Sequence, residues 1–104
     1  MSDETPVFLL ALLKVEDLPG FMENYAGPLG PINARHGVEA VLRATQLRAI
    51  EGSVEENVAA VLRFPSEKAL DAWYNDPDYA PLIEKRLELT DGNVSRLIAL
   101  TPVG

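Results

Sequence analysis

The first half of the chain contains two different patterns of apolar residues, one after the other. Residues 7–15 are apolar at nearly every position, which is typical of a central strand covered on both faces. In residues 18–25 the apolar side chains recur every three or four positions instead, which is typical of one face of a helix. Glycine and proline at residues 27–31 predict a break in this helix. A short helical piece over residues 31–36 is then predicted to end at Gly37.

The second half contains two β-rich runs, two helical segments and a final strand. The runs over residues 38–50 and 57–64 are joined by a short polar segment, which suits a hairpin of antiparallel strands. Ser66 can cap the next helix, because its hydroxyl oxygen can accept a hydrogen bond from a first-turn N–H. The remaining elements are predicted as a helix over 66–74, a turn at 76–80, a helix over 82–89 and a strand over 94–101.

This β-α-β-β-α-β order predicts an α+β protein of the ferredoxin-like class, with a four-stranded antiparallel sheet and helices on one face. Side chains alternate between the faces of a strand, so residues of the second strand fall into two sets. Val41, Arg43, Thr45 and Leu47 share one face, and Ala40, Leu42 and Ala44 share the other. Both sets are largely apolar, although helices cover only one face. Because monomers rarely leave a large apolar surface in water, we predict a homodimer that pairs through the open sheet face.

Composition narrows the class of protein. The chain has 104 residues, with 9 Lys and Arg against 16 Asp and Glu and a formal net charge of −7. We expect a single domain over residues 1–104, with residues 1–6 as a flexible N-terminal tail. The acidic balance argues against a nucleic-acid partner, and the longest apolar run, residues 7–13, is too short to cross a membrane. The N-terminus lacks the pattern of a secretory signal, which predicts a small soluble protein of the cytoplasm.

The residue inventory excludes several kinds of catalytic centre. The sequence has no cysteine and one histidine. Thiol catalysis, iron–sulfur clusters, Cys-based zinc sites and multi-histidine metal centres are therefore excluded, and we expect neither a metal nor a cofactor. The carboxylates Asp71, Asp76 and Asp78 are spread along a helix end and a turn, and we interpret them as solvated surface and caps.

Arginines inside the predicted strands are the first candidates for binding. A charged group in a covered sheet must find a partner or water, and Arg43, Arg63 and Arg96 all meet this condition. If they converge, a guanidinium group can clamp a carboxylate or enolate oxygen, with Arg43 the first candidate. The alternative is that they form structural ion pairs at strand ends or across a dimer, with Glu39, Glu51 or Glu55.

The other candidates are one histidine and a group of aromatic residues. His36 is the residue best suited to acid–base chemistry near neutral pH, but it also lies at a helix end, where it can simply bond the last carbonyls. Trp73, Tyr74 and Tyr79 can line an apolar pocket or form part of the core. Trp73 fits the core, whereas the tyrosine hydroxyls need polar partners or a pocket mouth, and Tyr79 is the first candidate of the two to face a ligand.

The end of the third predicted strand and the helix after it carry a pattern that resembles a known family. Phe-Pro-Ser stands at residues 64–66, and Ala-Trp-Tyr-Asn-Asp-Pro-Asp-Tyr-Ala-Pro-Leu stands at residues 72–82, with Arg86 a few residues later. In order and spacing this pattern is similar to that of the domain of unknown function 1330 family. The resemblance extends over residues 7–101.

The resemblance implies a fold and an assembly. Members of this family are similar to dimeric α/β-barrel proteins, in which two ferredoxin-like sheets pack face to face. Gly37 and Arg43 also match the family pattern, whereas Val38, Ala44 and Thr45 stand where the family commonly has glycine. The family has no settled activity, so the resemblance implies no reaction.

Three functions follow as alternatives. The first is a binding module that holds a small, aromatic or carboxylated molecule in a pocket between sheet and helices, with Arg43, Tyr79, Tyr74, Arg63 and Trp73 as its candidate residues. The second is a cofactor-free enzyme of the oxygenase or isomerase kind, in which Arg43 holds an anionic oxygen and Tyr79 or His36 relays a proton. The third is a structural dimer without a ligand, whose interior is filled by Trp73, Phe64 and leucines.

Overall fold

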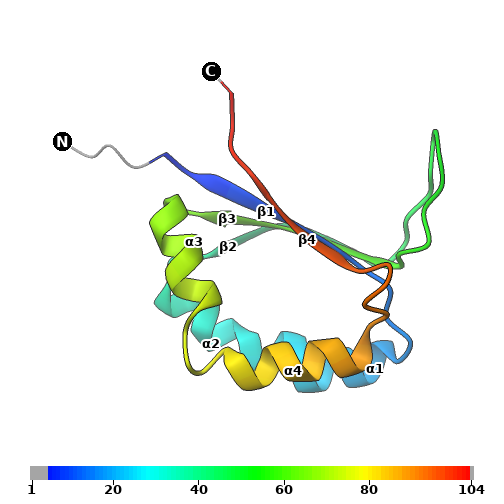
Figure 1. Cartoon of the computed structure of the whole chain (residues 1–104), viewed down its shortest axis with the longest axis horizontal. Coiled ribbons are helices and arrows are strands. Elements are labelled where there is room, and N and C mark those ends of the chain that lie inside the picture. The colour runs from blue at the N-terminus through cyan, green and yellow to red at the C-terminus, as the bar shows by residue number, and fades with distance from the viewer. Residues whose placement is uncertain (1–4, 104) are drawn as a thin grey trace.

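A computed structural model of the protein describes residues 5–103 and contains one four-stranded antiparallel sheet. The strands are β1 (Val7–Leu13), β2 (Glu39–Ala44), β3 (Val58–Phe64) and β4 (Arg96–Leu100), and they lie in the order β2-β3-β1-β4. This order confirms the predicted ferredoxin-like class (Figure 1). Of the predicted tail at residues 1–6, residues 1–4 lie outside the described part of the chain.

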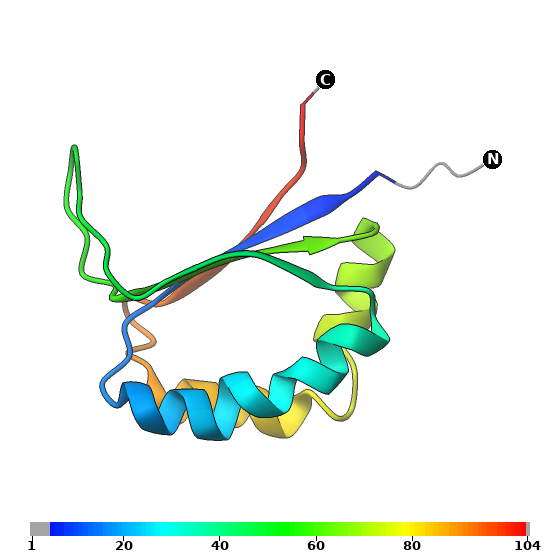
Figure 2. The same ribbon diagram turned by 180° about the vertical axis from the view of Figure 1, so that it is seen from behind.

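The helices all lie on one face of the sheet. They are α1 (Leu18–Phe21), the π-helical segment η1 (Met22–Ala26), α2 (Gly27–Arg35), α3 (Glu67–Tyr74) and α4 (Ala80–Leu89). Figure 2 shows α1, η1 and α2 as one rod beneath β2 and β3, and Figure 1 shows α4 beside it beneath β4. The helical layer is joined to the sheet by α3, which follows β3 directly. No helix formed by residues 5–103 lies on the other face of the sheet.

The predicted break at residues 27–31 is wrong, because the helix continues to Arg35. In η1 the hydrogen bonds span one more residue than in an α-helix, and this segment ends where the N–H of Gly27 donates to the Met22 carbonyl. Pro28 comes directly afterwards, in the first turn of α2, where a missing N–H costs nothing. Pro31 lies inside α2. Because proline has no N–H, Pro31 cannot form the usual helical hydrogen bond to the carbonyl of Gly27, four residues before it.

The strand predicted over residues 38–50 is also too long. β2 ends at Ala44, which pairs with Ala59 near the start of β3, so the residues after Ala44 have no strand beside them. The pairing also slips by one residue inside β2, where Ala40 lies opposite Leu62 and Leu42 lies opposite Val61. A bulge of this kind breaks the alternation of faces, so the prediction that Ala40 and Leu42 share a face is wrong.

The two faces of the sheet differ in what covers them. In β1 the residues Val7, Leu9, Ala11 and Leu13 are buried under the helices. The residues between them, and their partners in the pairing register, form the face without helices, which we call the open face. It comprises the apolar residues Phe8, Leu10, Leu12, Leu42, Ala44, Ala59, Val61, Ile98 and Leu100, together with the charged residues Glu39, Arg63 and Arg96. As predicted, both faces are therefore largely apolar.

Candidate functional site

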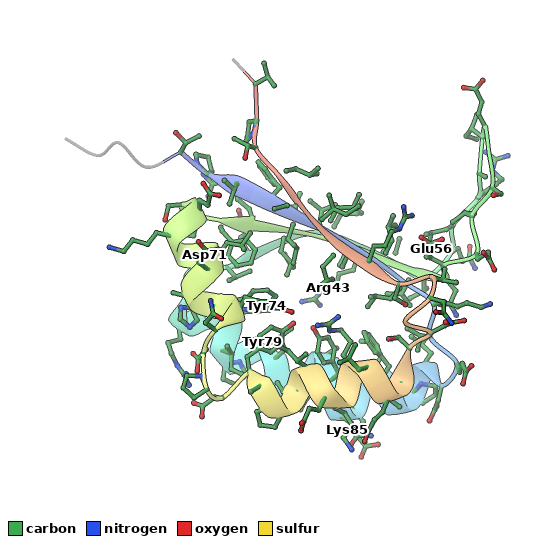
Figure 3. The ribbon with its side chains drawn as sticks, viewed as in Figure 1. Arg43, Glu56, Asp71, Tyr74, Tyr79 and Lys85 are labelled. Carbon is green, nitrogen blue, oxygen red and sulfur yellow. The ribbon has the colours of Figure 1, made fainter. Side chains whose placement is uncertain are left out.

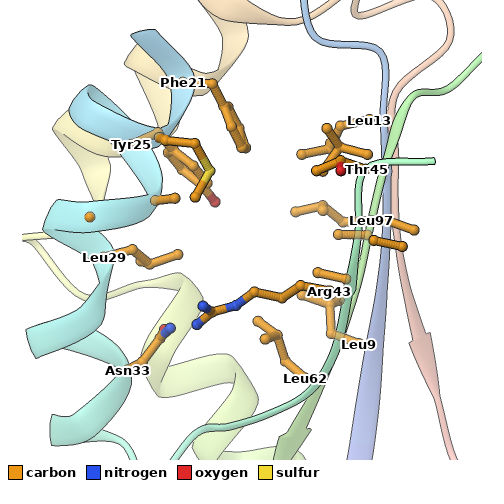
Figure 4. Close-up of a pocket in the computed structure, with 18 of the residues that line it drawn as sticks. Leu9, Leu13, Phe21, Tyr25, Leu29, Asn33, Arg43, Thr45, Leu62 and Leu97 are labelled. Atoms are coloured by element: carbon orange, nitrogen blue, oxygen red, sulfur yellow. The ribbon is translucent and has the colours of Figure 1, made fainter. Parts of the chain in front are cut away.

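A cavity of about 270 Å³ lies between the sheet and the rod of α1, η1 and α2. Its walls are largely apolar, and Leu9, Leu13 and Leu62 contribute to the sheet side. Phe21 and Leu29 face them from the helices (Figure 4). The cavity's polar side chains are Tyr25, Asn33, Arg43 and Thr45. An apolar cavity with a few polar groups at defined places is the usual form of a small-molecule site.

Arg43 is the charged residue of this cavity. It lies in β2 opposite Ala60, and its side chain extends under the sheet toward Leu29 and Asn33 of α2 (Figures 3 and 4). None of the ion pairs formed within residues 5–103 includes Arg43. Its planar guanidinium group is therefore free to bind an oxygen of a ligand by two hydrogen bonds.

Asn33 places a second donor beside Arg43, and sequence reasoning missed it. The indole Nε1 of Trp73 donates to Asn33 Oδ1 at 2.8 Å. Because an indole N–H can only donate, this bond fixes which end of the Asn33 amide is oxygen and leaves its Nδ2 hydrogens for the cavity. Asn33 lies four residues before Gly37, inside a helix that the sequence predicted as broken, so its position relative to the cavity depends on the continuous helix.

The predicted aromatic residues have different positions. Trp73 is 1% exposed and packs edge-on against Phe64 at 5.1 Å between ring centroids, so it belongs to the core while one side of it lines the cavity. Tyr79 is fully buried and shares a 2.6 Å hydrogen bond between its hydroxyl and that of Tyr25. Tyr74 is half exposed. Of these three predicted ligand residues, Trp73 lines this cavity and the two tyrosines do not.

The hydroxyl pair of Tyr25 and Tyr79 stays protonated near neutral pH. Burial raises the pKa of Tyr25 above its ordinary value, and burial also raises the pKa of Tyr79. Neither hydroxyl is therefore suited to act as a base. The pair can donate a hydrogen bond and fixes the position of both rings, and the predicted proton relay through Tyr79 stays a prediction.

His36 lies away from the cavity and bonds a carboxylate rather than the last helix carbonyls. Its Nε2 is 2.7 Å from Asp76 Oδ2, and Arg35 Nη1 donates to the same oxygen at 2.7 Å. The backbone N–H of Asp78 donates to Asp76 Oδ1 at 2.9 Å. The hydrogen bond from His36 and those from Asp78 and Arg35 lower the pKa of Asp76 to about 2. The interpretation of Asp76 as a solvated carboxylate is wrong, because it is buried and holds α2 to the turn before α4.

The three strand arginines do not converge. Arg43 faces the helices, whereas Arg63 and Arg96 lie on the open face of the sheet, opposite Phe8 and Leu12 of β1. Arg96 Nη2 donates to Glu56 Oε2 at 2.7 Å, and this bond lowers the pKa of Glu56. Arg63 lies opposite Glu39 in the sheet register. The structure thus separates Arg63 from the cavity that it was predicted to serve.

Other kinds of site find no support in the described part of the chain. No group of three or more His, Asp or Glu side chains is placed to hold a metal ion within residues 5–103. Across the same residues, no helix has the length and apolar character needed to span a bilayer.

Comparison with known proteins identifies the family. Residues 6–99 match the family described as "Domain of unknown function (DUF1330)". The chain belongs to this family. A search of the curated proteins gave no significant match.

Solved structures share the fold at low sequence identity. The RPA0582 protein of unknown function from Rhodopseudomonas palustris is 22% identical with a TM-score of 0.78, over 97% of this chain and 85% of that one. A dimeric ferredoxin-like protein of unknown function from Jannaschia sp. CCS1 is 14% identical with a TM-score of 0.78, over 93% and 99%. SnoaB, a cofactor-independent oxygenase from Streptomyces nogalater, is 18% identical with a TM-score of 0.67, over 95% and 94%. These solved structures share the fold of this chain, and the Jannaschia protein among them is dimeric.

Proposed function

We propose that the protein binds one small, largely apolar molecule through an anionic or carbonyl oxygen. The ligand body occupies the cavity between the sheet and the rod of α1, η1 and α2, and its oxygen is held by Arg43 and Asn33. The observation that carries the proposal is the pairing of an ion-pair-free guanidinium group with a spare amide donor at one end of an apolar cavity. Its volume of about 270 Å³ suits a molecule near the lower limit of the usual range for small-molecule sites.

The same geometry favours binding over turnover. Within the described residues, the cavity lining holds no carboxylate or histidine that can serve as a base, and burial raises the pKa of its tyrosine, Tyr25. His36 is held by Asp76 outside the cavity. SnoaB is a cofactor-independent oxygenase with a similar fold, and that likeness bears on the fold alone.

The proposed functional unit is a homodimer that forms through the open face. Two features support it: the apolar open face has no helix over it, and the similar protein from Jannaschia is dimeric. An isologous pair of sheets would cover this face on both copies and leave the cavity, on the helix side, untouched.

The binding proposal is tested by ligand titration of the purified protein and of two matched variants. Met22 and Leu29 line this cavity, so the methyl NMR resonances of these two residues report a ligand there. A panel of aromatic carboxylates is titrated against the wild type, Arg43→Met and Arg48→Met. Arg48 lies exposed in the connection between β2 and β3, so its substitution removes the same charge at a distance from the cavity.

We expect at least one carboxylate to bind the wild type and Arg48→Met equally, and Arg43→Met about tenfold or more weakly, because a charge-assisted hydrogen bond is lost. Equal affinity of all three proteins for every bound carboxylate would contradict the role of Arg43. Native mass spectrometry of the protein as purified adds an independent readout, since a copurified molecule should be retained by the wild type and lost from Arg43→Met.

A further inference from the structure

A second hollow, of about 420 Å³, opens on the other side of the core, where α3 and α4 face β1 and β4. Its walls are mostly apolar and include Leu70, Ile83, Leu87 and Ala99. It shares Leu9, Trp73 and Leu97 with the first cavity, so those three side chains separate the two spaces. Tyr74, whose side chain points inward in Figure 3 and is half exposed, lies at this hollow.

Arg86 is the charged residue of the second hollow. Only 7% of it is exposed, and its Nε is buried without a hydrogen-bond partner. Among the ion pairs found in residues 5–103, none includes Arg86. Removing a cation from water without a counter-charge is costly, so a buried arginine is normally paired with a carboxylate or another anion.

The groups that contact Arg86 do not supply that negative charge. Its guanidinium carbon lies 5.9 Å from the centroid of the Tyr25 ring, a cation–π contact. The Tyr25 hydroxyl in turn shares its hydrogen bond with Tyr79. The positive charge of Arg86 and its hydrogen bonding to the two hydroxyls act to lower the pKa of both tyrosines, but burial outweighs these effects and the pKa of each stays raised. Both rings are therefore neutral at physiological pH, and the charge of Arg86 is balanced by neither.

We propose that Arg86 is the anion-binding residue of a second ligand site, which takes the carboxylate of a small molecule with an aromatic or branched apolar body. The guanidinium fork matches the planar carboxylate, and its free Nε supplies one of the two parallel hydrogen bonds of that pairing. The apolar body packs against Ile83 and Leu87 of α4. This site is separate from the one around Arg43 and does not depend on it.

Benzoate is the probe, and methyl-resolved NMR of the intact chain separates the two sites. Ile83 and Leu87 line the second hollow alone, whereas Met22 and Leu29 line the first cavity alone. We expect benzoate to shift the methyl resonances of Ile83 and Leu87 to saturation. Benzamide, the neutral molecule of the same shape, is expected to bind there at least about tenfold more weakly, because it lacks the charge. Shifts at Met22 and Leu29 report the Arg43 site independently, so failure at one site is distinguishable from failure at the other.

Arg86→Met is the decisive variant, with Arg48→Met as its matched control. We expect the affinity measured at Ile83 and Leu87 to fall about tenfold or more in Arg86→Met and to stay unchanged in Arg48→Met. Arg86→Lys keeps the charge without the planar fork, and we expect it to lose several-fold in affinity while the Trp73 emission spectrum stays that of the folded protein. If Arg86→Met does not fold, the affinity of Arg86→Lys for benzoate provides the test.

Two results would overturn the proposal. One is the absence of a saturable shift at Ile83 and Leu87 at benzoate concentrations up to about 10 mM, the weak limit of a specific site. The other is equal benzoate affinity in the wild type and the folded Arg86 variants, which would leave Arg86 with a purely structural contact to Tyr25.

Discussion

Asp76 shows how one side chain joins distant parts of this chain. It accepts hydrogen bonds from Arg35 and His36 at the end of α2 and from the backbone of Asp78 before α4. Its pKa of about 2 in the fold lies below the ordinary value, so the unfolded chain binds a proton at this carboxyl more readily than the folded one. Asp76 therefore stabilises the fold above its ordinary pKa, and that stabilisation is lost as the pH falls toward 2.

The corresponding prediction concerns Asp76→Asn. We expect this variant to be less stable than the wild type at pH 7, because the carboxylate that accepts hydrogen bonds from Arg35 and His36 is lost. The gap in unfolding free energy should narrow as the pH falls from about 4 toward about 2, because the unfolded wild-type chain takes up a proton at this carboxyl before the folded one does. Urea unfolding across this pH range measures the gap.

Asp71→Asn is the control for this prediction. Asp71 is exposed on α3 and forms none of the ion pairs of residues 5–103. Its substitution should leave the unfolding free energy nearly unchanged at pH 7. A gap between Asp76→Asn and the wild type that stays constant down to pH 2 would contradict the role given to the Asp76 carboxylate.

At the scale of elements, the turn from α2 into β2 depends on one glycine. Gly37 has φ of +69°, and its N–H donates to the Ala34 carbonyl while that of Val38 donates to the Asn33 carbonyl. This left-handed conformation ends the helix and sends the chain into the strand that carries Arg43. A Cβ at this position would lie 3.1 Å from Cγ of Pro65, so the site is also tight.

We predict that Gly37→Ala destabilises the fold by about 1–2 kcal/mol, because a side chain in the left-handed region clashes with its own backbone. The matched control is Gly30→Ala. Gly30 lies in the interior of α2, and a Cβ there would meet no atom within 4 Å. That control should stabilise the protein by about 0.5–1 kcal/mol, because alanine is the better helix former. Denaturant unfolding of the two variants under one set of conditions checks both signs, and a Gly37→Ala protein as stable as the wild type would refute the first.

At the scale of the whole molecule, the sheet has one face under helices and one open to solvent. Leu42 and Leu100 are 56% and 42% exposed on the open face, at its two opposite edges, and the strands between them add further apolar side chains. A surface of this kind is unusual in a monomer and is covered most simply by a second copy of itself.

We predict that light scattering gives a mass of twice 11.4 kDa at micromolar concentrations. Ile98→Glu, which places a charge among the apolar side chains of the open face, on β4 opposite Leu10, should weaken the dimer at least about tenfold. Ile50→Glu is the matched control, because Ile50 is 78% exposed in the connection between β2 and β3, away from the open face. A monomeric mass for the wild type, or equal dimer dissociation constants for Ile98→Glu and Ile50→Glu, would contradict the prediction.

The predictions that succeeded rest on local patterns. The run of apolar residues at 7–15, the helical spacing in residues 18–25 and the capping Ser66 all describe how a segment behaves by itself, and they were enough to predict the strand order of the ferredoxin-like class. The alternation of side chains along each strand also predicted two apolar faces, because this alternation is a property of a single strand and needs no partner strand.

The predictions that failed depend on residues far apart in the chain. The continuous helix through Pro28 needs the π-helical turn before it, and the end of β2 is decided by where β3 stops offering a partner. The burial of Asp76 requires Arg35 and His36, which lie about forty positions away in the sequence. No local spacing encodes such contacts, because they form only when packing brings the segments together.

The sequence by itself determined the class of fold, its apolar faces and the absence of thiol and multi-histidine chemistry, because these follow from composition and short-range periodicity. Only the tertiary structure decided which arginines face the interior. A bulge in β2 directs Arg43 to the helix side, the sheet register keeps Arg63 and Arg96 on the other side, and the packing of α4 buries Arg86. The side on which a charge lies depends on register and packing, and those are properties of the assembled chain.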